Sequence, residues 1–113
     1  QLVDKKILKS CANITGGGLY ENIKRIIPKG LVADIDLKEI KTKKIFKWIK
    51  NYNVNDKEML KTFNCGVGFC LVIKEKNFNK VKKIFSKEFQ PYKIGEIKKG
   101  NNKVSLNGKI VWK

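Results

Sequence analysis

Residues 12–28 read ANITGGGLYENIKRIIP, an extended segment that runs into three consecutive glycines and then into a helix. We expect that helix to extend from about Leu19 to Ile27, because Pro28 cannot continue it. Consecutive glycines let backbone N–H groups turn toward one point without a Cβ to keep an anion away. A helix start adds free donors and a partial positive charge. The segment therefore predicts a phosphate-sized site at residues 15–18, with a glycine turn that binds nothing as the alternative.

The residues on either side predict helices that alternate with strands. Before the glycines, an apolar stripe predicts a short helix over residues 2–11. After them, we expect strands at 31–35, 66–74 and 92–97, helices at 42–52, 55–63 and 78–89, and a hairpin at 104–112 that turns at Asn107-Gly108. The strand at 66–74 is apolar throughout and is expected to be central, with both faces covered. The fold class is therefore α/β or α+β, a mixed β-sheet with flanking helices.

Two of these helices carry more detailed expectations. The helix at 42–52 is amphipathic, and the residues expected to face inward are Ile45, Phe46, Trp48, Ile49 and Tyr52. The sequence NDKE at 55–58 has the form of a capping box, which predicts a helix start at Asn55.

A second glycine-containing stretch, TFNCGVG at residues 62–68, leads into the apolar strand. Asn64 is expected either to bond the backbone of a helix-to-strand turn or to present its amide at the lip of a cleft. We interpret Cys65 as a small buried hydrophobe, because no His is present to activate it as a nucleophile.

The composition is strongly basic, with 26 Lys and Arg residues against 10 Asp and Glu and a formal net charge of +16. Such a surplus is typical of proteins that bind nucleic acid or an anionic membrane surface. However, 25 of these residues are Lys, and the chain also holds 14 Ile and 11 Asn. Codons for all three can be written with A and T alone. Drift in an AT-rich genome therefore explains much of the charge without an acidic partner.

Other counts exclude whole classes of function. The absence of His excludes His-based acid–base chemistry, Ser–His nucleophiles and His-ligated metals within this chain. The three cysteines have no zinc-like spacing, so we expect no metal site, and an odd number of them fits a reducing cytoplasm. No apolar run approaches the roughly 20 residues of a membrane-spanning helix, so we expect no membrane partner.

Four blocks of the sequence resemble one enzyme family. Residues 13–28 resemble the pattern A-H-I-T-G-G-G-x-x-E-N-I-P-R-x-L-P, and residues 58–68, EMLKTFNCGVG, resemble E-M-x-x-T-F-N-C-G-V-G. Residues 46–49 are similar to its I-F-x-W-L helix, and residues 92–97 to its W-x-I-G-x-I strand. In this order the blocks resemble the C-terminal domain of aminoimidazole ribonucleotide (AIR) synthetase, also called phosphoribosylformylglycinamidine cyclo-ligase.

This resemblance implies a role in de novo purine synthesis. Enzymes of the family use ATP and Mg²⁺ to activate the formyl amide oxygen of formylglycinamidine ribonucleotide as a phosphate ester. The amidine nitrogen then attacks, phosphate leaves and the imidazole ring closes. The resemblance further implies a cytoplasmic homodimer that binds a small-molecule substrate and no nucleic acid.

The resemblance covers about the last third of such an enzyme. We therefore expect residues 1–113 to form a single, incomplete AIR synthase C-terminal domain, without the N-terminal domain that binds ATP and forms the dimer. A chain of this kind is not expected to be active alone.

The matched positions imply site residues. Thr15, Gly16, Gly17 and Gly18 would line the cleft near a phosphate, and Asn22, Arg25 and Asn64 would hold that loop and the substrate side in place. Arg25 is informative because it is the only Arg in a chain rich in Lys, and Lys cannot replace its bidentate donors.

Asn13 departs from the family pattern, because it stands where the family has a His. Asn forms hydrogen bonds but cannot carry a proton through a reaction, so this position is a doubtful catalytic residue.

Two alternative functions stay open. Asn13 favours a degenerate relative that has kept the fold without the chemistry, and the basic composition favours a nucleic-acid-binding module. Against the latter, the lysines lie on several helix faces and not on one stripe.

Overall fold

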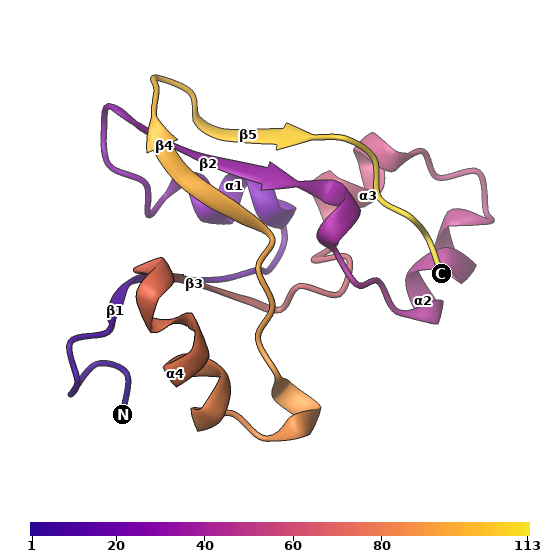
Figure 1. Ribbon diagram of the computed structural model, residues 1–113. Coiled ribbons are helices and arrows are strands. Elements are labelled where there is room, and N and C mark those ends of the chain that lie inside the picture. Colours follow the sequence, from indigo (N-terminus) through magenta and orange to yellow (C-terminus); the bar gives the residue numbers. More distant parts are fainter.

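The computed structural model describes all residues, 1–113, and has five strands and four α-helices (Figure 1). The strands are β1 (Leu8–Asn13), β2 (Leu31–Asp36), β3 (Phe69–Ile73), β4 (Gly95–Lys99) and β5 (Lys103–Asn107). The helices are α1 (Gly18–Lys24), α2 (Lys44–Lys50), α3 (Asp56–Thr62) and α4 (Phe78–Ile84), with short 3₁₀ helices at Leu37–Glu39, Glu75–Asn77 and Lys87–Phe89. The α+β class expected from the sequence is confirmed, with two separate sheets.

The larger sheet is mixed and has the strand order β4-β2-β5. Its central strand, β2, pairs antiparallel with β4 and parallel with β5. The side chains of Ala33 and Ile35 alternate with more exposed neighbours and are buried on the inner face, as the two-residue period of a strand requires. The expected strand at 31–35 is therefore confirmed.

The smaller sheet consists of β1 and β3, which pair antiparallel from Leu8 opposite Ile73 to Asn13 opposite Phe69. The register shifts between Leu8 and Ser10. The strand expected at 66–74 is present as β3, but the expectation that it is central was wrong, because β3 pairs with β1 alone and its first residue, Phe69, is 57% exposed.

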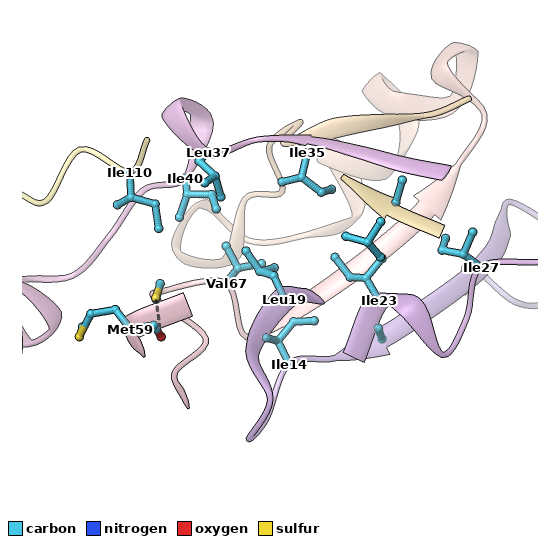
Figure 2. Close-up of a cluster of buried hydrophobic side chains, with 14 residues drawn as sticks. Ile14, Leu19, Ile23, Ile27, Ile35, Leu37, Ile40, Met59, Val67 and Ile110 are labelled. Atoms are coloured by element: carbon cyan, nitrogen blue, oxygen red, sulfur yellow. Dashed lines mark hydrogen bonds between the residues drawn. The ribbon is translucent and has the colours of Figure 1, made fainter. Parts of the chain in front are cut away.

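The hydrophobic core lies between the larger sheet and α1. Figure 2 shows Leu19 and Ile23 of α1 beneath Ile35 of β2, with Met59 of α3 and Val67 alongside. Burial of each such side chain stabilises the fold by about 1.5–3 kcal/mol. The glycine turn that precedes α1 is therefore attached to the core through its own helix.

The expected helix over residues 2–11 was wrong. Residues 2–6 form turns, Val3 is exposed, and the chain is a strand from Leu8 onward. The segment does contain apolar residues at helical spacing, but a helix this short is only marginally stable on its own. Pairing with β3 provides the backbone hydrogen bonds instead.

The expected hairpin at Asn107-Gly108 was also wrong. Gly108 has a positive φ of 74°, but the chain does not pair back after it and runs on without regular structure to Lys113. Val104 before the turn and Ile110 after it are both buried. The segments before and after Gly108 thus both contribute to the core, and the segment after it does not pair with β5.

The helix expected at 42–52 is present as α2, but only part of its apolar face is covered. Phe46 and Ile49 pack against the core, whereas Ile45, Trp48 and Tyr52 are more than half exposed. The helices expected at 19–27 and 78–89 are shorter than predicted. Each of the four α-helices has seven residues, too few to span a membrane.

Candidate functional site

The glycine turn lies between β1 and α1 and is anchored at both ends. On the entry side, Ile14 is buried, and its backbone N–H donates to the carbonyl oxygen of Gly68 at 2.9 Å. On the exit side, Gly17 and Gly18 have φ values of 96° and 67°, a region that glycine enters without steric cost. Thr15 and Gly16, between these anchors, are exposed.

Asn22 holds the turn from inside. Its side chain is buried, and its amide Nδ2 donates to the carbonyl oxygens of Gly18, Thr15 and Gly16 at 2.8, 3.2 and 3.3 Å. Its Oδ1 accepts from the Thr15 hydroxyl at 3.4 Å and from Arg25 Nη1 at the same distance. One buried amide therefore sets the conformation of the whole turn.

This arrangement directs the N–H groups of Gly16 and Gly17 outward. In a trans peptide the C=O and the following N–H point in opposite directions, and all peptide bonds here are trans. Because the carbonyls of Thr15 and Gly16 point at Asn22, the N–H groups of Gly16 and Gly17 point away from it. No hydrogen bond within the chain engages either of them. They are two neighbouring donors available to an external acceptor.

The three glycines have different surroundings. A Cβ on Gly18 would lie 1.7 Å from the carbonyl oxygen of Leu60, and one on Gly17 would lie 2.9 Å from Glu21 Cβ. A Cβ on Gly16 would meet nothing within 4 Å. Gly17 and Gly18 therefore have structural reasons to be glycine, and Gly16 has none within this chain.

The two stretches singled out in the sequence lie side by side. Gly18 packs against the end of α3 through the carbonyls of Leu60 and Phe63, and Ile14 bonds Gly68. Sequence reasoning did not identify the Leu60 carbonyl as the neighbour that requires a glycine at position 18. No local pattern could have indicated it, because the contact joins residues far apart in the chain.

Of the two roles considered for the Asn64 side chain, a bond to the backbone of its own turn and an amide at the lip of a cleft, the structure has the first. Its Oδ1 accepts from the N–H of Gly66 at 2.9 Å, and its backbone carbonyl accepts from Val67 N–H at 3.0 Å. It therefore holds the turn between α3 and β3, directly beside the glycine turn. Gly66, with φ 103°, would bring a Cβ to 2.8 Å from the carbonyl of Lys41.

The remaining predicted residues lie at the edge of the site. Arg25 is exposed and reaches the turn through Asn22 alone. Asn13, at the end of β1 opposite Phe69, is exposed and makes no side-chain hydrogen bond. Both side chains can therefore reach an external molecule.

Cys65 lies behind this site and is fully buried. Its thiol donates to the carbonyl oxygen of Met59 at 3.5 Å, the contact dashed in Figure 2, and is 3.7 Å from that of Phe63. Burial, with a smaller contribution from the Asp56 carboxylate, raises the pKa of this thiol to about 11. Cys65 is thus a packed core residue, as interpreted from the sequence, and is unsuited to act as a nucleophile.

Residues 1–113 contain no group of three or more His, Cys, Asp or Glu side chains that could hold a metal ion. Mg²⁺ prefers oxygen ligands and is commonly held through one or two carboxylates together with substrate phosphates. The residues around the glycine turn do not supply such a set, because Glu21 is the nearest acid there and stands alone.

Comparison with known proteins identifies the family. Residues 1–107 match the family described as "AIR synthase related protein, C-terminal domain". Among curated proteins, the chain is 41% identical over 98 residues to a phosphoribosylformylglycinamidine cyclo-ligase of Staphylococcus saprophyticus, which covers 85% of this chain and 29% of that protein. It is 38% identical over 107 residues to a protein of the same name from Clostridium botulinum, covering 94% of this chain and 32% of that protein.

The chain thus spans about a third of the length of the curated relatives that it matches. Within that third, the matched region includes both the glycine turn and the Asn64 turn. The family match extends over nearly all of the residues, and the chain belongs to the family of AIR synthase related proteins, as a C-terminal domain.

Proposed function

We propose that this chain is part of a phosphoribosylformylglycinamidine cyclo-ligase, the enzyme that closes the imidazole ring of aminoimidazole ribonucleotide in purine synthesis. The printed name of the relatives supports this proposal. The observation that carries it is the pair of outward N–H groups at Gly16 and Gly17, held by Asn22. The substrate in this proposal is formylglycinamidine ribonucleotide, and the complete enzyme is a cytoplasmic homodimer that uses ATP and Mg²⁺.

The proposed task of the glycine turn is to bind a phosphate group. Two adjacent backbone donors suit two oxygens of one phosphate, and the lack of a Cβ at Gly16 lets the anion approach closely. The Arg25 guanidinium borders the same turn, and its N–H groups other than the one that bonds Asn22 are donors of the kind that phosphate accepts. Asn22 acts by positioning the turn, and Asn64 by holding the neighbouring one.

Asn13 would orient substrate and not transfer a proton. Its exposed amide can donate and accept hydrogen bonds, but it does not ionise. Any proton transfer in the complete enzyme then falls to groups outside these residues or to water. These residues offer no ligand set for Mg²⁺.

Phosphate binding can be tested by amide NMR titration with inorganic phosphate. We expect the amides of Gly16 and Gly17 to shift first. In an Asn22→Ala variant those shifts should weaken, because the carbonyls of Thr15 and Gly16 lose their donor and the turn is no longer held. An Asn101→Ala variant, altered at an exposed turn elsewhere, serves as the control. Shifts confined to surface lysines would contradict the proposed site.

The activity can be tested with the complete natural polypeptide that carries these residues. We expect ATP-dependent ring closure, which is measured as release of inorganic phosphate and formation of the aminoimidazole product. An Asn13→His variant should be assayed alongside, since it restores an ionisable group at that position. Absence of activity in both proteins, with each folded, would overturn the enzyme assignment and favour a non-catalytic relative.

A further inference from the structure

A second feature, separate from the glycine turn, is a lysine-lined groove on the smaller sheet. The groove has a volume of about 730 Å³ and lies between residues 5–9 at the start of β1 and residues 74–84 after β3. Seven of its eleven lining residues are Lys, and none is acidic. We call this cavity the lysine groove.

The fold assembles the lysine groove from segments far apart in the sequence. Antiparallel pairing sets Leu8 opposite Ile73, which brings the residues before β1 beside those after β3. Helix α4 then returns along the same side, below β1 and β3 in Figure 1. Three lysines come from residues 5–9 and four from residues 74–83. The sequence alone suggested scattered lysines, because this pairing was not predicted.

None of the seven lysines forms an ion pair. The lysines that form salt bridges are Lys50, Lys93 and Lys98, and none of them lines the groove. The two acids closest in sequence, Asp4 and Glu75, do not line the groove, and Glu75 pairs with Lys93 at 3.3 Å. Like charges that line one cleft repel each other and attract anions from solution. The lysine groove is thus complementary to a chain of negative charges.

We propose that the lysine groove binds the phosphodiester backbone of a single-stranded nucleic acid. Ammonium groups bind phosphate as point charges, and seven of them suit a ligand that repeats its charge along a chain. The only hydrophobic lining residues are Ile7 and Ile84, so the groove offers no apolar pockets for the side chains of a docked peptide. Its concave shape does not match a flat membrane surface.

The lining also sets the character of the binding. No aromatic side chain and no Arg lines the groove, so bases are neither stacked nor read. Binding is therefore electrostatic and independent of sequence. At physiological salt, a dissociation constant of about 10⁻⁶–10⁻⁴ M is expected for such contacts.

The test compares two triple variants of equal net charge. One replaces Lys9, Lys80 and Lys83 of the lysine groove by Gln. The control replaces Lys43, Lys44 and Lys47, which are also exposed and unpaired but lie on and before α2, at the right of Figure 1. Binding of a labelled oligouridylate is measured by fluorescence anisotropy between about 50 and 200 mM salt.

We expect the groove variant to lose at least about tenfold in affinity and to reduce the slope of log affinity against log salt by about 2, since each lost phosphate contact on a single strand removes about 0.7. The control should change affinity by less than about twofold. Amide NMR of the unaltered chain should show shifts at residues 5–9 and 74–84 on addition of the oligonucleotide.

Equal losses in the two variants would overturn the proposal, because total charge and not the groove would then decide binding. Polyglutamate of matched charge is the second arm. If it binds as tightly and responds in the same way to the groove variant, the occupant is an acidic peptide and the phosphodiester assignment is wrong.

Discussion

At the scale of single residues, the three consecutive glycines differ in what surrounds each of them. Gly18 lies against the backbone of α3, Gly17 adopts a positive φ beside Glu21, and Gly16 is open to solvent. The proposed phosphate site depends on the outer glycine, whereas the fold needs the inner two. Substitutions can therefore separate stability from binding.

We predict that Gly18→Ala destabilises the protein by about 3 kcal/mol or more, because the new Cβ meets the Leu60 carbonyl at 1.7 Å in a strained region of φ. Gly16→Ala should leave the free energy of unfolding within about 0.5 kcal/mol, since it meets no atom, while weakening phosphate binding. Urea unfolding monitored by circular dichroism measures the free energy of unfolding of both variants. Similar stability losses in the two variants would contradict the observed packing.

The cysteines give a second prediction at this scale. Cys65 is fully buried, and burial also raises the pKa of the Cys70 thiol to about 11. Thiolate is the reactive form, so neither thiol should react with a maleimide at pH 7.5 in the folded protein. Mass spectrometry after brief labelling checks this, with urea-unfolded protein as the control that should label fully. Rapid labelling of Cys65 under native conditions would show that α3 opens readily.

At the scale of elements, helix starts were more predictable than strand partners. Asn55 caps α3 as expected, with its Oδ1 accepting from the Glu58 N–H at 2.9 Å. Such caps are local, because the interacting residues are three apart. By contrast, the pairing of β1 with β3 joins segments about 60 residues apart, so residues 2–11 were assigned to the wrong element.

We predict that Asn55→Ala lowers the free energy of unfolding by about 1 kcal/mol, because it leaves the Glu58 N–H without its acceptor. Asn55→Asp should retain most of the stability, since a carboxylate accepts the same hydrogen bond and favours a helix start. Thermal unfolding of the three proteins gives the comparison. A loss in the Asp variant as large as that in the Ala variant would argue against capping as the cause.

At the scale of the whole molecule, three acids interact with lysines in a chain with a large positive surplus. Hydrogen bonding from Lys98 holds the pKa of Asp34 below its usual value, against some desolvation, and Lys93 does the same for Glu96. Desolvation acts to raise the pKa of Asp56, but hydrogen bonds from Lys50 and Trp112 outweigh it and lower the pKa overall. All three carboxylates are therefore more acidic when the protein is folded.

This predicts loss of stability in acid. A carboxylate whose folded pKa is depressed contributes stability above its unfolded pKa, near 4, and loses it as pH falls through the lower folded value. The free energy of unfolding should therefore be constant from pH 7 to about pH 5 and fall below pH 4. Urea unfolding at several pH values measures it, with Asp56→Asn expected to reduce the dependence. A stability that rises below pH 4 would contradict the ion pairs.

The sequence predicted the two turns better than it predicted the sheets. The glycine turn, the helix after it and the adjacent Asn64 turn lie within short stretches, where glycine, proline and amide chemistry determine the backbone. The role of Gly18 and the lysine groove could not be predicted, since both depend on contacts between distant segments. The inward face of α2 was over-predicted, because helical periodicity identifies an apolar stripe without saying whether anything covers Trp48 or Tyr52.

The position of β2 has a consequence for biosynthesis. Both of its neighbours, β4 and β5, lie beyond residue 94, so β2 has no complete strand partner until Lys99, the last residue of β4, has left the ribosome. At about 5–20 residues per second, the nascent chain presents the apolar face of β2 unpaired for several seconds. Contacts so distant in sequence also slow folding itself. Chaperone binding to nascent chains should therefore centre on residues 31–36 and decline once β5 has been synthesised.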